Sequence, residues 1–251
     1  MTSDVSIIIP TYKRPEKLAR ALSSVAQACS LQHEIFVIDD CPDGSAYPVA
    51  MQFKAQYFCK SGQRRGLSRS RNIGIDLSGG KFLLFLDDDD YLLPSSIDAL
   101  HHHAMSGGYS VVFGDFSNLF PNEKIRVDLS LLTHDHLLIC NQIPVGAYMM
   151  ERSSIRQQFD ERMRSHEDWD FLLCNMEWQR CKHVPIEVVT VDKTENLDMS
   201  MQARRRQYFW LDFIAIYSKY PAPSLSGHRK NMLLGLGIDI DESMLGHADT
   251  I

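Results

Sequence analysis

The sequence predicts an α/β fold built on a mostly parallel sheet with helices on its faces. Short apolar runs of strand length alternate with helix-length segments over roughly the first hundred residues. The first two runs, VSIII at residues 5–9 and EIFVI at residues 34–38, are nearly continuous in apolar residues, as in strands buried on both faces. Aspartates or turn residues follow them. Ligands of such sheets bind beyond the carboxyl ends of the strands, so these segments should converge on one crevice.

The elements of the first half follow from local patterns. Pro10 should end the first strand, because proline cannot donate to a central ladder. Pro15 suits the first turn of a helix, and apolar residues recur behind it at helical spacing. Ser95 and Asp98 have the spacing of a capping box at the start of a later helix. We expect further strands over residues 56–59 and 81–86, and helices over residues 67–77 and 96–105.

The pattern loosens in the second half. A turn around residues 121–123 favours a hairpin. The tail from residue 200 is mainly helical in pattern; its stretch RRRQYFWLDFIAIY could rest on an anionic membrane, but packing over the core is the favoured explanation. Periodicity and apolar runs predict helices over residues 130–139 and 168–179, and strands over residues 109–113, 145–150 and 184–191.

Composition excludes several classes of protein. The 251 residues are 44% hydrophobic, which is enough for a sizeable core, and the formal net charge of -6 argues against a general nucleic-acid binder. The six cysteines include no CxxC pair, so we expect neither a zinc knuckle nor a disulfide scaffold. No run approaches the roughly 18 apolar residues of a membrane span. We therefore expect a cytoplasmic protein, with peripheral contact at the inner face of the membrane as a further option.

Four consecutive aspartates follow the apolar run KFLLFL. Two carboxylates about 5 Å apart repel by roughly 3 kcal/mol at an effective dielectric constant near 20, so a bound cation is the first candidate to offset this repulsion. Carboxylate oxygens suit Mg²⁺ or Mn²⁺. Alternate residues of an extended strand point to one side, so Asp87 and Asp89 can share an ion while Asp88 and Asp90 face elsewhere. A solvated acidic loop is the alternative explanation.

Four motifs in this order resemble glycosyltransferase family 2. They are SIIIPTYKRPEKLARALSSV, EIFVIDD, GLSRSRNIGIDLSGGKFLLFLDDDDYLLP and QFDERMRSHEDWDFLL, and together they cover residues 5–173. The resemblance implies the GT-A fold, a mostly parallel Rossmann-like sheet flanked by helices, with a helical C-terminal extension. It also implies a catalytic domain at residues 1–195, divided into a nucleotide-sugar-binding half (1–114) and an acceptor-binding half (115–195), and an extension at residues 196–251.

The resemblance places a nucleotide base beside the first two strands. Pro10, Thr11 and Tyr12 would line the base pocket, with the Tyr12 ring stacked on the base. Asp40 would accept a hydrogen bond from the ring N–H of a uracil-type base. Considered singly, Tyr12 could equally be a half-buried aromatic residue and Asp40 a turn cap.

The resemblance assigns charged residues to the phosphate side of the site. Asp87 and Asp89 would hold Mn²⁺ or Mg²⁺, with Asp88 as the alternative to Asp87. Arg71 would contact the donor, and we expect Arg14 and Asp88 among the donor-binding residues. For the other arginines of the loop at residues 60–71, a solvated basic surface is the favoured explanation.

The motif HEDWD supplies the expected catalytic base. Sugar transfer needs a group that takes the proton of the acceptor hydroxyl as its oxygen attacks the anomeric carbon. The resemblance assigns that role to Asp168, with Glu167 positioning the acceptor or the base. The alternative is that both acids only favour the positive end of the helix that they open.

The function that the resemblance implies is metal-dependent, inverting glycosyl transfer. The donor would be a nucleotide diphosphate sugar, with a UDP-sugar favoured, and the acceptor a hydroxyl of a carbohydrate or a lipid-linked carbohydrate in polysaccharide or surface glycan biosynthesis. One alternative is a partner protein that binds the sugar nucleotide without turnover. A D-x-D phosphatase is a weaker alternative, since Tyr91 and Leu92 follow the aspartates in place of the usual threonine or valine. A nucleotidyltransferase would need a glycine-rich loop where PTYKR stands.

Overall fold

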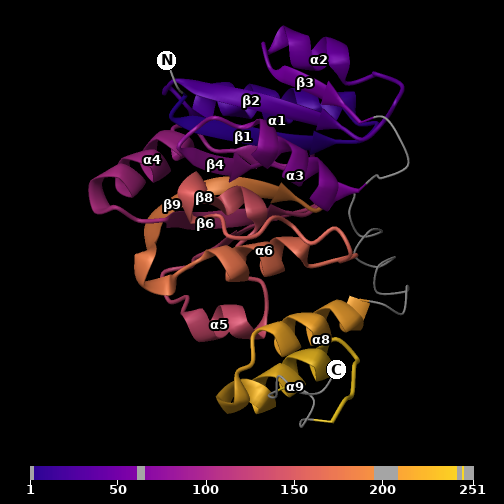
Figure 1. Cartoon of the computed structure of the whole chain (residues 1–251), viewed down its shortest axis with the longest axis vertical. Coiled ribbons are helices and arrows are strands. Elements are labelled where there is room, and N and C mark those ends of the chain that lie inside the picture. Colours follow the sequence, from indigo (N-terminus) through magenta and orange to yellow (C-terminus); the bar gives the residue numbers. More distant parts are fainter. Residues whose placement is uncertain (1–2, 61–65, 195–208, 242–244, 246–251) are drawn as a thin grey trace.

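The computed structural model describes residues 3–60, 66–194, 209–241 and 245, folded as strands and helices (Figure 1). The strands are β1 (Val5–Thr11), β2 (His33–Asp39), β3 (Gln56–Cys59), β4 (Phe82–Phe85), β5 (Tyr91–Leu92), β6 (Val111–Leu119), β7 (Lys124–Val127), β8 (Tyr148–Glu151) and β9 (Cys181–Asp192). The α-helices are α1 (Pro15–Ala28), α2 (Tyr47–Gln52), α3 (Leu67–Leu77), α4 (Ser96–Gly107), α5 (His134–Ile139), α6 (Glu167–Asn175), α8 (Phe209–Lys219) and α9 (Ser226–Gly235). Short 3-10 helices are η1 (Val145–Ala147), η2 (Arg152–Ser154), η3 (Trp178–Arg180) and η4 (Pro223–Leu225).

Within the described residues, one nine-stranded sheet runs in the order β3-β2-β1-β4-β8-β6-β9-β5, with β7 paired to β6. The first four strands pair in parallel, as the strand and helix alternation of the first half predicts. The second half joins them through β8, which is antiparallel to both β4 and β6, while β6 and β9 are parallel. The sheet is therefore mixed, and its parallel half carries the strand ends where a ligand would bind.

Apolar side chains from the sheet and helices form the core. Every residue of β1 and of β4 is buried. Helix α1 turns Leu18, Leu22 and Val25 inward, which is the face that its apolar spacing predicts. The C-terminal helices α8 and α9 lie beyond α5, at the opposite end of the molecule from α2 (Figure 1).

The structure corrects several expected boundaries. Strand β1 continues through Pro10, because the β4 ladder ends at Ile8 and the Thr11 carbonyl faces β2, so the missing N–H of Pro10 breaks no ladder bond. The capping box is also wrong. Ser95 has a positive φ of 59° and no side-chain cap bond, and Asp98 instead accepts hydrogen bonds from the backbone N–H and hydroxyl of Ser30.

The second half also departs from its expected boundaries. The helix expected over residues 130–139 is shorter, because Thr133 caps α5 in a capping box with His136. The helix expected over residues 168–179 ends at Asn175, and the strand expected from residue 145 opens with a 3-10 turn. The hairpin around residues 121–123 is confirmed by β6 and β7. Two short elements, α2 and β5, were not predicted.

Candidate active site

A pocket of about 760 Å³ opens at the carboxyl ends of the parallel strands. This volume lies within the range typical of small-molecule and cofactor sites. Eight of the residues that the sequence selected line it together, which places three separate segments around one space. The pocket is lined by Pro10, Thr11, Tyr12, Arg14, Asp40, Leu67, Ser70, Asp87, Asp88, Asp89 and Lys193.

The four aspartates at residues 87–90 form a turn after β4 and do not continue the strand. Asp88 and Asp89 lie in a turn closed by the hydrogen bond from Asp90 N–H to the Asp87 carbonyl. For this reason the expectation that Asp88 faces elsewhere is wrong, because side chains do not alternate through a turn. Asp90 does point elsewhere: its Oδ1 accepts from the backbone N–H of Asp192 at 2.9 Å, beside β9.

Arg14 is paired with two members of this cluster. Its Nη2 lies 2.6 Å from Asp88 Oδ1 and its Nη1 donates to Asp89 Oδ2 at 2.6 Å. Thr11 also donates its hydroxyl to Asp88 Oδ2 at 2.7 Å. Burial raises the pKa of Asp88 to about 6, although Arg14 and Thr11 act in the opposite direction.

Arg71 connects the aspartate cluster to helix α6. Its Nη2 donates to Asp87 Oδ1 at 2.7 Å and its Nη1 to Glu167 Oε1 at 2.8 Å. The Arg71 side chain is only 2% exposed, and it does not line the pocket. The guanidinium lies over the Phe159 ring at 5.2 Å from the centroid. Burial acts to lower the pKa of Arg71, but the charges of Asp87 and Glu167 outweigh it, and the pKa is raised. Arg71 therefore fixes the position of Asp87 relative to Glu167.

Asp168 follows Glu167 in the first turn of α6. Its Oδ2 accepts from Asn141 Nδ2 at 2.9 Å, and its Oδ1 accepts from the backbone N–H of Trp169 at 2.8 Å. Burial and the neighbouring Glu167 raise the pKa of Asp168 to about 6. A carboxylate with this pKa is ionised at pH 7 and basic enough to accept a proton from a hydroxyl group as that group attacks.

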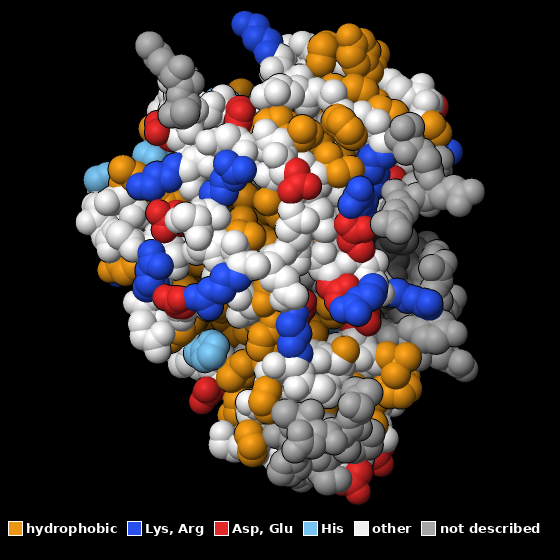
Figure 2. All heavy atoms as spheres, viewed as in Figure 1, with side chains coloured by type: hydrophobic (Ala, Val, Ile, Leu, Met, Phe, Trp, Pro, Cys, Tyr) orange, Lys and Arg blue, Asp and Glu red, His pale blue; other side chains and the backbone are white. Residues whose placement is uncertain are grey.

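Tyr12 and Asp40, two of the residues expected to bind the base, both line this pocket. The Tyr12 side chain is 45% exposed, so its ring is accessible for stacking. Asp40 Oδ2 accepts from the backbone N–H of Gly66 at 2.8 Å, and Asp40 Oδ1 lies 2.9 Å from Lys60 Nζ. Figure 2 shows acidic and basic side chains lying next to one another at several places on this face of the molecule.

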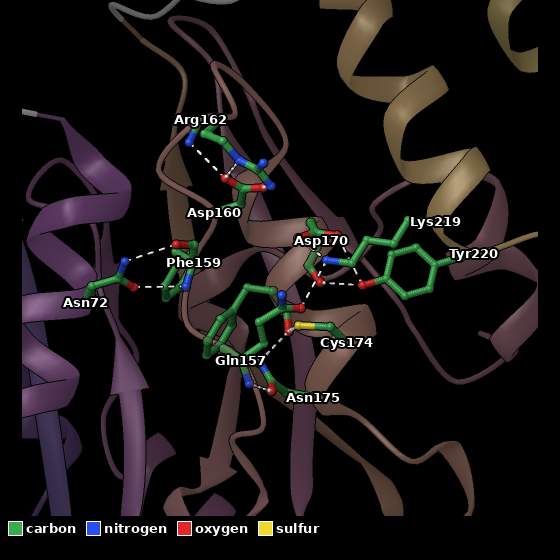
Figure 3. Close-up of polar contacts among 11 residues, drawn as sticks. Asn72, Gln157, Phe159, Asp160, Arg162, Asp170, Cys174, Asn175, Lys219 and Tyr220 are labelled. Atoms are coloured by element: carbon green, nitrogen blue, oxygen red, sulfur yellow. Dashed lines mark hydrogen bonds and ion pairs between the residues drawn. The ribbon is translucent and has the colours of Figure 1, made fainter. Parts of the chain in front are cut away.

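A second network of hydrogen bonds joins α3 to α6 through residues 157–159 (Figure 3). Asn72 exchanges two hydrogen bonds with the backbone of Phe159, at 3.0 and 2.9 Å. Asn175 donates to the Gln157 carbonyl at 2.8 Å. These bonds hold residues 157–159 between α3 and α6, so the helix that carries Arg71 and the helix that carries Asp168 keep a fixed separation.

The sequence reasoning missed four residues around the site, among them Leu67, which lines the pocket from the start of α3. Lys193 follows β9 and lines the pocket with the aspartates, and Ser70 lines it from α3. Asn141 contacts Asp168 from the segment after α5. A basic residue directly after the last strand was a usable signal for Lys193, whereas nothing in the sequence around Asn141 indicated its contact. Arg64 and Arg65 of the expected basic loop lie outside the described residues.

The chemistry of the cluster fits a hard divalent cation. Asp87 and Asp89 offer carboxylate oxygens on one pocket wall, the ligand type that Mg²⁺ and Mn²⁺ prefer. Away from this pocket, ligand atoms of Asp115, Asp128 and His183 lie within 4.8 Å of one another. There Asp115 accepts from Arg126 at 2.7 Å and lies 2.8 Å from His183 Nε2, and none of these three possible ligands lines the pocket.

Comparisons with known proteins identify relatives of this chain. The model of the family "Glycosyl transferase family 2" matches residues 6–210. A Campylobacter jejuni protein named GalNAc(5)-diNAcBac-PP-undecaprenol beta-1,3-glucosyltransferase is 32% identical over 147 residues, 53% of this chain and 47% of that protein. An uncharacterized glycosyltransferase of Haemophilus influenzae is 26% identical over 185 residues, 67% of this chain and 60% of its own length. The matched region thus spans about half to three fifths of these two relatives.

Two solved structures share the fold. Staphylococcus aureus TarS 1-349 in complex with UDP-GlcNAc superposes with a TM-score of 0.70 at 16% identity, over 97% of this chain and 69% of that one. The mannosyltransferase PcManGT from Pyrobaculum calidifontis, in complex with GDP-Man and Mn²⁺, gives a TM-score of 0.64 at 14% identity, over 95% and 71%. Such neighbours confirm the predicted GT-A fold. Among the described residues, no helix is long and apolar enough to cross a membrane.

Proposed function

This chain belongs to glycosyl transferase family 2, and on that premise we propose that it transfers a sugar, with inversion, from a nucleoside diphosphate donor to a hydroxyl group of a carbohydrate acceptor. A UDP-sugar is the favoured donor. The observation that carries the proposal is that one pocket is lined by the exposed ring of Tyr12 and by Asp40 together with Asp87, Asp88 and Asp89. A nucleoside diphosphate needs both an aromatic surface for its base and charged groups or a metal ion for its diphosphate.

Charged residues that line the pocket would bind the sugar-nucleotide donor. Asp87 and Asp89 would hold Mg²⁺ or Mn²⁺, and the ion would supply positive charge that stabilises the departing diphosphate. Arg14 and Lys193 bring further positive charge to the same pocket, which suits the phosphate oxygens of the donor. Tyr12 would stack on the base while Pro10 and Thr11 shape its surroundings, and Asp40 would accept from the ring N–H. Arg71 would act from behind by holding Asp87.

Asp168 would be the catalytic base. Its carboxylate would accept the proton of the acceptor hydroxyl while that oxygen attacks the anomeric carbon and the nucleoside diphosphate leaves from the opposite face. Glu167, held by Arg71, would position the acceptor. The pKa of about 6 for Asp168 supports this role, because the group is ionised at neutral pH without being a very weak base.

The acceptor and the division of the chain are also proposals. The name of the Campylobacter relative supports a lipid-linked carbohydrate acceptor, which would bring the enzyme to the inner face of a membrane. We assign residues 1–114 to donor binding, residues 115–195 to acceptor binding and residues 196–251 to an extension packed on the domain. Of the stretch considered for membrane contact, the arginines at 204–206 lie outside the described residues, and Phe213, Ile216 and Tyr217 are buried against the core.

A transfer assay tests the proposal. Purified protein is given UDP-sugars with a glycan acceptor, in Mn²⁺ and after treatment with EDTA, beside Asp168→Asn. We expect transfer with Mn²⁺, loss of transfer in EDTA, and an inactive Asp168→Asn variant whose UDP affinity stays within about twofold of wild type, since that residue does not line the donor pocket. Equal rates after EDTA treatment contradict the metal role. Release of inorganic phosphate without sugar transfer favours the phosphatase alternative.

A further inference from the structure

We propose that Asn141 is a positioning residue for the Asp168 carboxylate, and that the C-terminal helices α8 and α9 hold Asn141 in place. The inference rests on the proposed function, because it takes Asp168 as the catalytic base. It gives a role to the C-terminal helices, which the family motifs at residues 5–173 do not include. Three sets of contacts carry it.

The first set fixes the orientation of Asn141. Its Nδ2 donates to Asp168 Oδ2 at 2.9 Å, and its Oδ1 accepts from the backbone N–H of Ile143 at 3.2 Å. Because a backbone N–H can only donate, the oxygen of the Asn141 amide must face Ile143, and the nitrogen must face Asp168. With Trp169 N–H on Oδ1, the Asp168 carboxylate is held at both oxygens, and the plane of the group is set.

The second set fixes the end of α5, from which Asn141 emerges. The last carbonyls of a helix have no partner within it. Three of them in succession accept side-chain donors from three other helices: Leu137 from Trp169 Nε1 at 2.7 Å, Leu138 from Arg229 Nε at 3.0 Å, and Ile139 from the Tyr217 hydroxyl at 2.6 Å. Two of these three donors, Arg229 and Tyr217, belong to α9 and α8.

Arg229 is a buried cation whose hydrogen bonds join α5, α8 and α9. Its residue surface is 0% exposed, and its guanidinium lies 4.2 Å from the centroid of the Tyr217 ring. Besides Leu138, it donates to the carbonyls of Tyr220 at 2.7 Å and Leu245 at 2.9 Å. Burying a charge is costly unless it is fully hydrogen-bonded, so this arginine is stable only while α5, α8 and α9 stay together.

The third set ties the extension to the helix of Asp168 itself. Asp170, two residues after Asp168, accepts from Lys219 Nζ at 2.8 Å and from the Tyr220 hydroxyl at 3.1 Å (Figure 3). Asp212 of α8 accepts from the backbone N–H of Ser165 at 2.8 Å, just before α6. The extension thus contacts both the segment that carries the base and the segment that carries its partner.

Asn141→Leu tests the contact, with Gln142→Leu as the matched control. Both remove an amide from the same segment, but the one polar contact of the Gln142 amide among the described residues is with Cys140 Sγ at 3.8 Å. We expect Asn141→Leu to lower kcat for transfer by about tenfold or more, as for a lost hydrogen bond to a charged group, with KM for the donor and UDP affinity unchanged. The acid limb of the pH profile should also move to higher pH, because the lost donor favoured the ionised carboxylate; Glu167, Arg71 and Asp87 still act on Asp168 in the variant.

Tyr217→Phe tests the link to the extension. It removes only the hydroxyl that Ile139 accepts, so we expect a smaller fall in kcat, about twofold to fivefold, again without a change in donor affinity. If both residues act through one contact, the double variant should be no slower than Asn141→Leu alone. Fully additive losses, or wild-type kcat in Tyr217→Phe, overturn the role of the extension.

Asn141→Ala is made in parallel and judged by the same criteria, so the proposal is tested even if the leucine variant does not fold. Wild-type kcat in Asn141→Ala or Asn141→Leu, or a loss equal to that of Gln142→Leu, overturns the positioning role. Asp168→Asn distinguishes a failure of the proposed function from a failure of the positioning role of Asn141. An active Asp168→Asn variant removes the proposed base and this inference with it, whereas an inactive one beside a fully active Asn141 variant removes the inference alone.

Discussion

At the scale of single residues, two arginines form ion pairs with four of the carboxylates at the site. Arg14 pairs with Asp88 and Asp89, and Arg71 pairs with Asp87 and Glu167. Within the part of the chain that the structure describes, Asp168 forms no such ion pair; it accepts hydrogen bonds from the Asn141 amide and the Trp169 backbone N–H.

The pKa of Asp168 predicts the pH dependence of transfer. Burial and Glu167 raise this pKa from 3.8 to about 6, and the base acts only when ionised. The rate should therefore rise with pH through about 6 and level off above it, as measured in initial-rate profiles at saturating substrate. An acid limb near pH 4 contradicts the assignment. Because the folded pKa is the higher one, the carboxyl favours folding at low pH and loses this contribution as pH rises through 6, so Asp168→Asn should raise Tm at pH 7.5 but not at pH 4.

Arg71 should matter for stability as well as for catalysis. Arg71→Met leaves Asp87 and Glu167 without their shared cation, and we expect a loss of about 2–3 kcal/mol in the free energy of unfolding, reduced from the fully buried case because Asp87 is 31% exposed. Arg71→Lys keeps the charge but can reach only one acid at a time, so its loss should be smaller. Urea denaturation measures both. Equal stability of wild type and Arg71→Met contradicts the bridging role.

Much of the candidate site could be predicted from the sequence, because its residues come directly after apolar runs or inside short motifs. The partners of those residues could not. That Asp88 shares the pocket depends on a turn within the aspartate run, and that Arg71 is buried depends on how α3 and α6 meet. Asn141 and Lys193 reach the site through folding of segments far away in sequence, which no local pattern encodes.

At the scale of elements, β4 lies very close to β1 at its start. A Cβ added at Gly80 would lie 2.7 Å from the backbone nitrogen of Ser6 and 2.9 Å from the Val5 carbonyl carbon. At the neighbouring Gly79, the nearest atom is Glu34 Oε1 at 3.6 Å, an ordinary contact. The close approach of β4 to β1 therefore requires a glycine at position 80 but not at position 79.

Gly80→Ala should destabilise the protein by about 1–3 kcal/mol, because the backbone of β1 cannot move aside as a side chain could. Gly79→Ala is the control and should change stability by less than about 0.5 kcal/mol. Thermal and urea unfolding of both variants measure the difference. Equal effects of the two substitutions contradict the close approach.

Element boundaries show where sequence patterns succeed. The bounds of α3 and β3 match the prediction, since glycines, a serine and turn residues flank them. The capping box at Ser95 failed because Ser30, distant in sequence, takes up the Asp98 carboxylate. The helix after residue 168 ended early because Asn175 turns its side chain back to the Gln157 carbonyl. Long-range contacts decided both cases.

At the scale of the whole molecule, α8 and α9 are joined to the domain by buried contacts. Phe213 and Tyr217 of α8 pack on Trp169 with ring centroids 5.4 and 6.0 Å apart, and Arg229 fixes α5 to α9. These contacts join the C-terminal helices α8 and α9 to α6, which carries Asp168, and to α5. Folding of the two parts should be coupled.

We expect thermal unfolding in a single transition, with equal calorimetric and van't Hoff enthalpies. Arg229→Met should lower the midpoint of that transition without splitting it, because the carbonyls of Leu138 in α5 and Tyr217 in α8 lose their buried donor. Scanning calorimetry measures both quantities. Two separate transitions in the wild type contradict the coupling.

The central claim is that Asp87 and Asp89 bind the diphosphate of a sugar nucleotide through a divalent ion. Anomalous diffraction at the manganese edge, from crystals soaked with Mn²⁺ and UDP, tests it most directly. The account predicts a peak within about 2.0–2.4 Å of oxygens of these two aspartates, with the diphosphate bound to the same ion and the base beside Tyr12. A peak at Asp115, Asp128 and His183, or UDP bound away from this pocket, would contradict the claim.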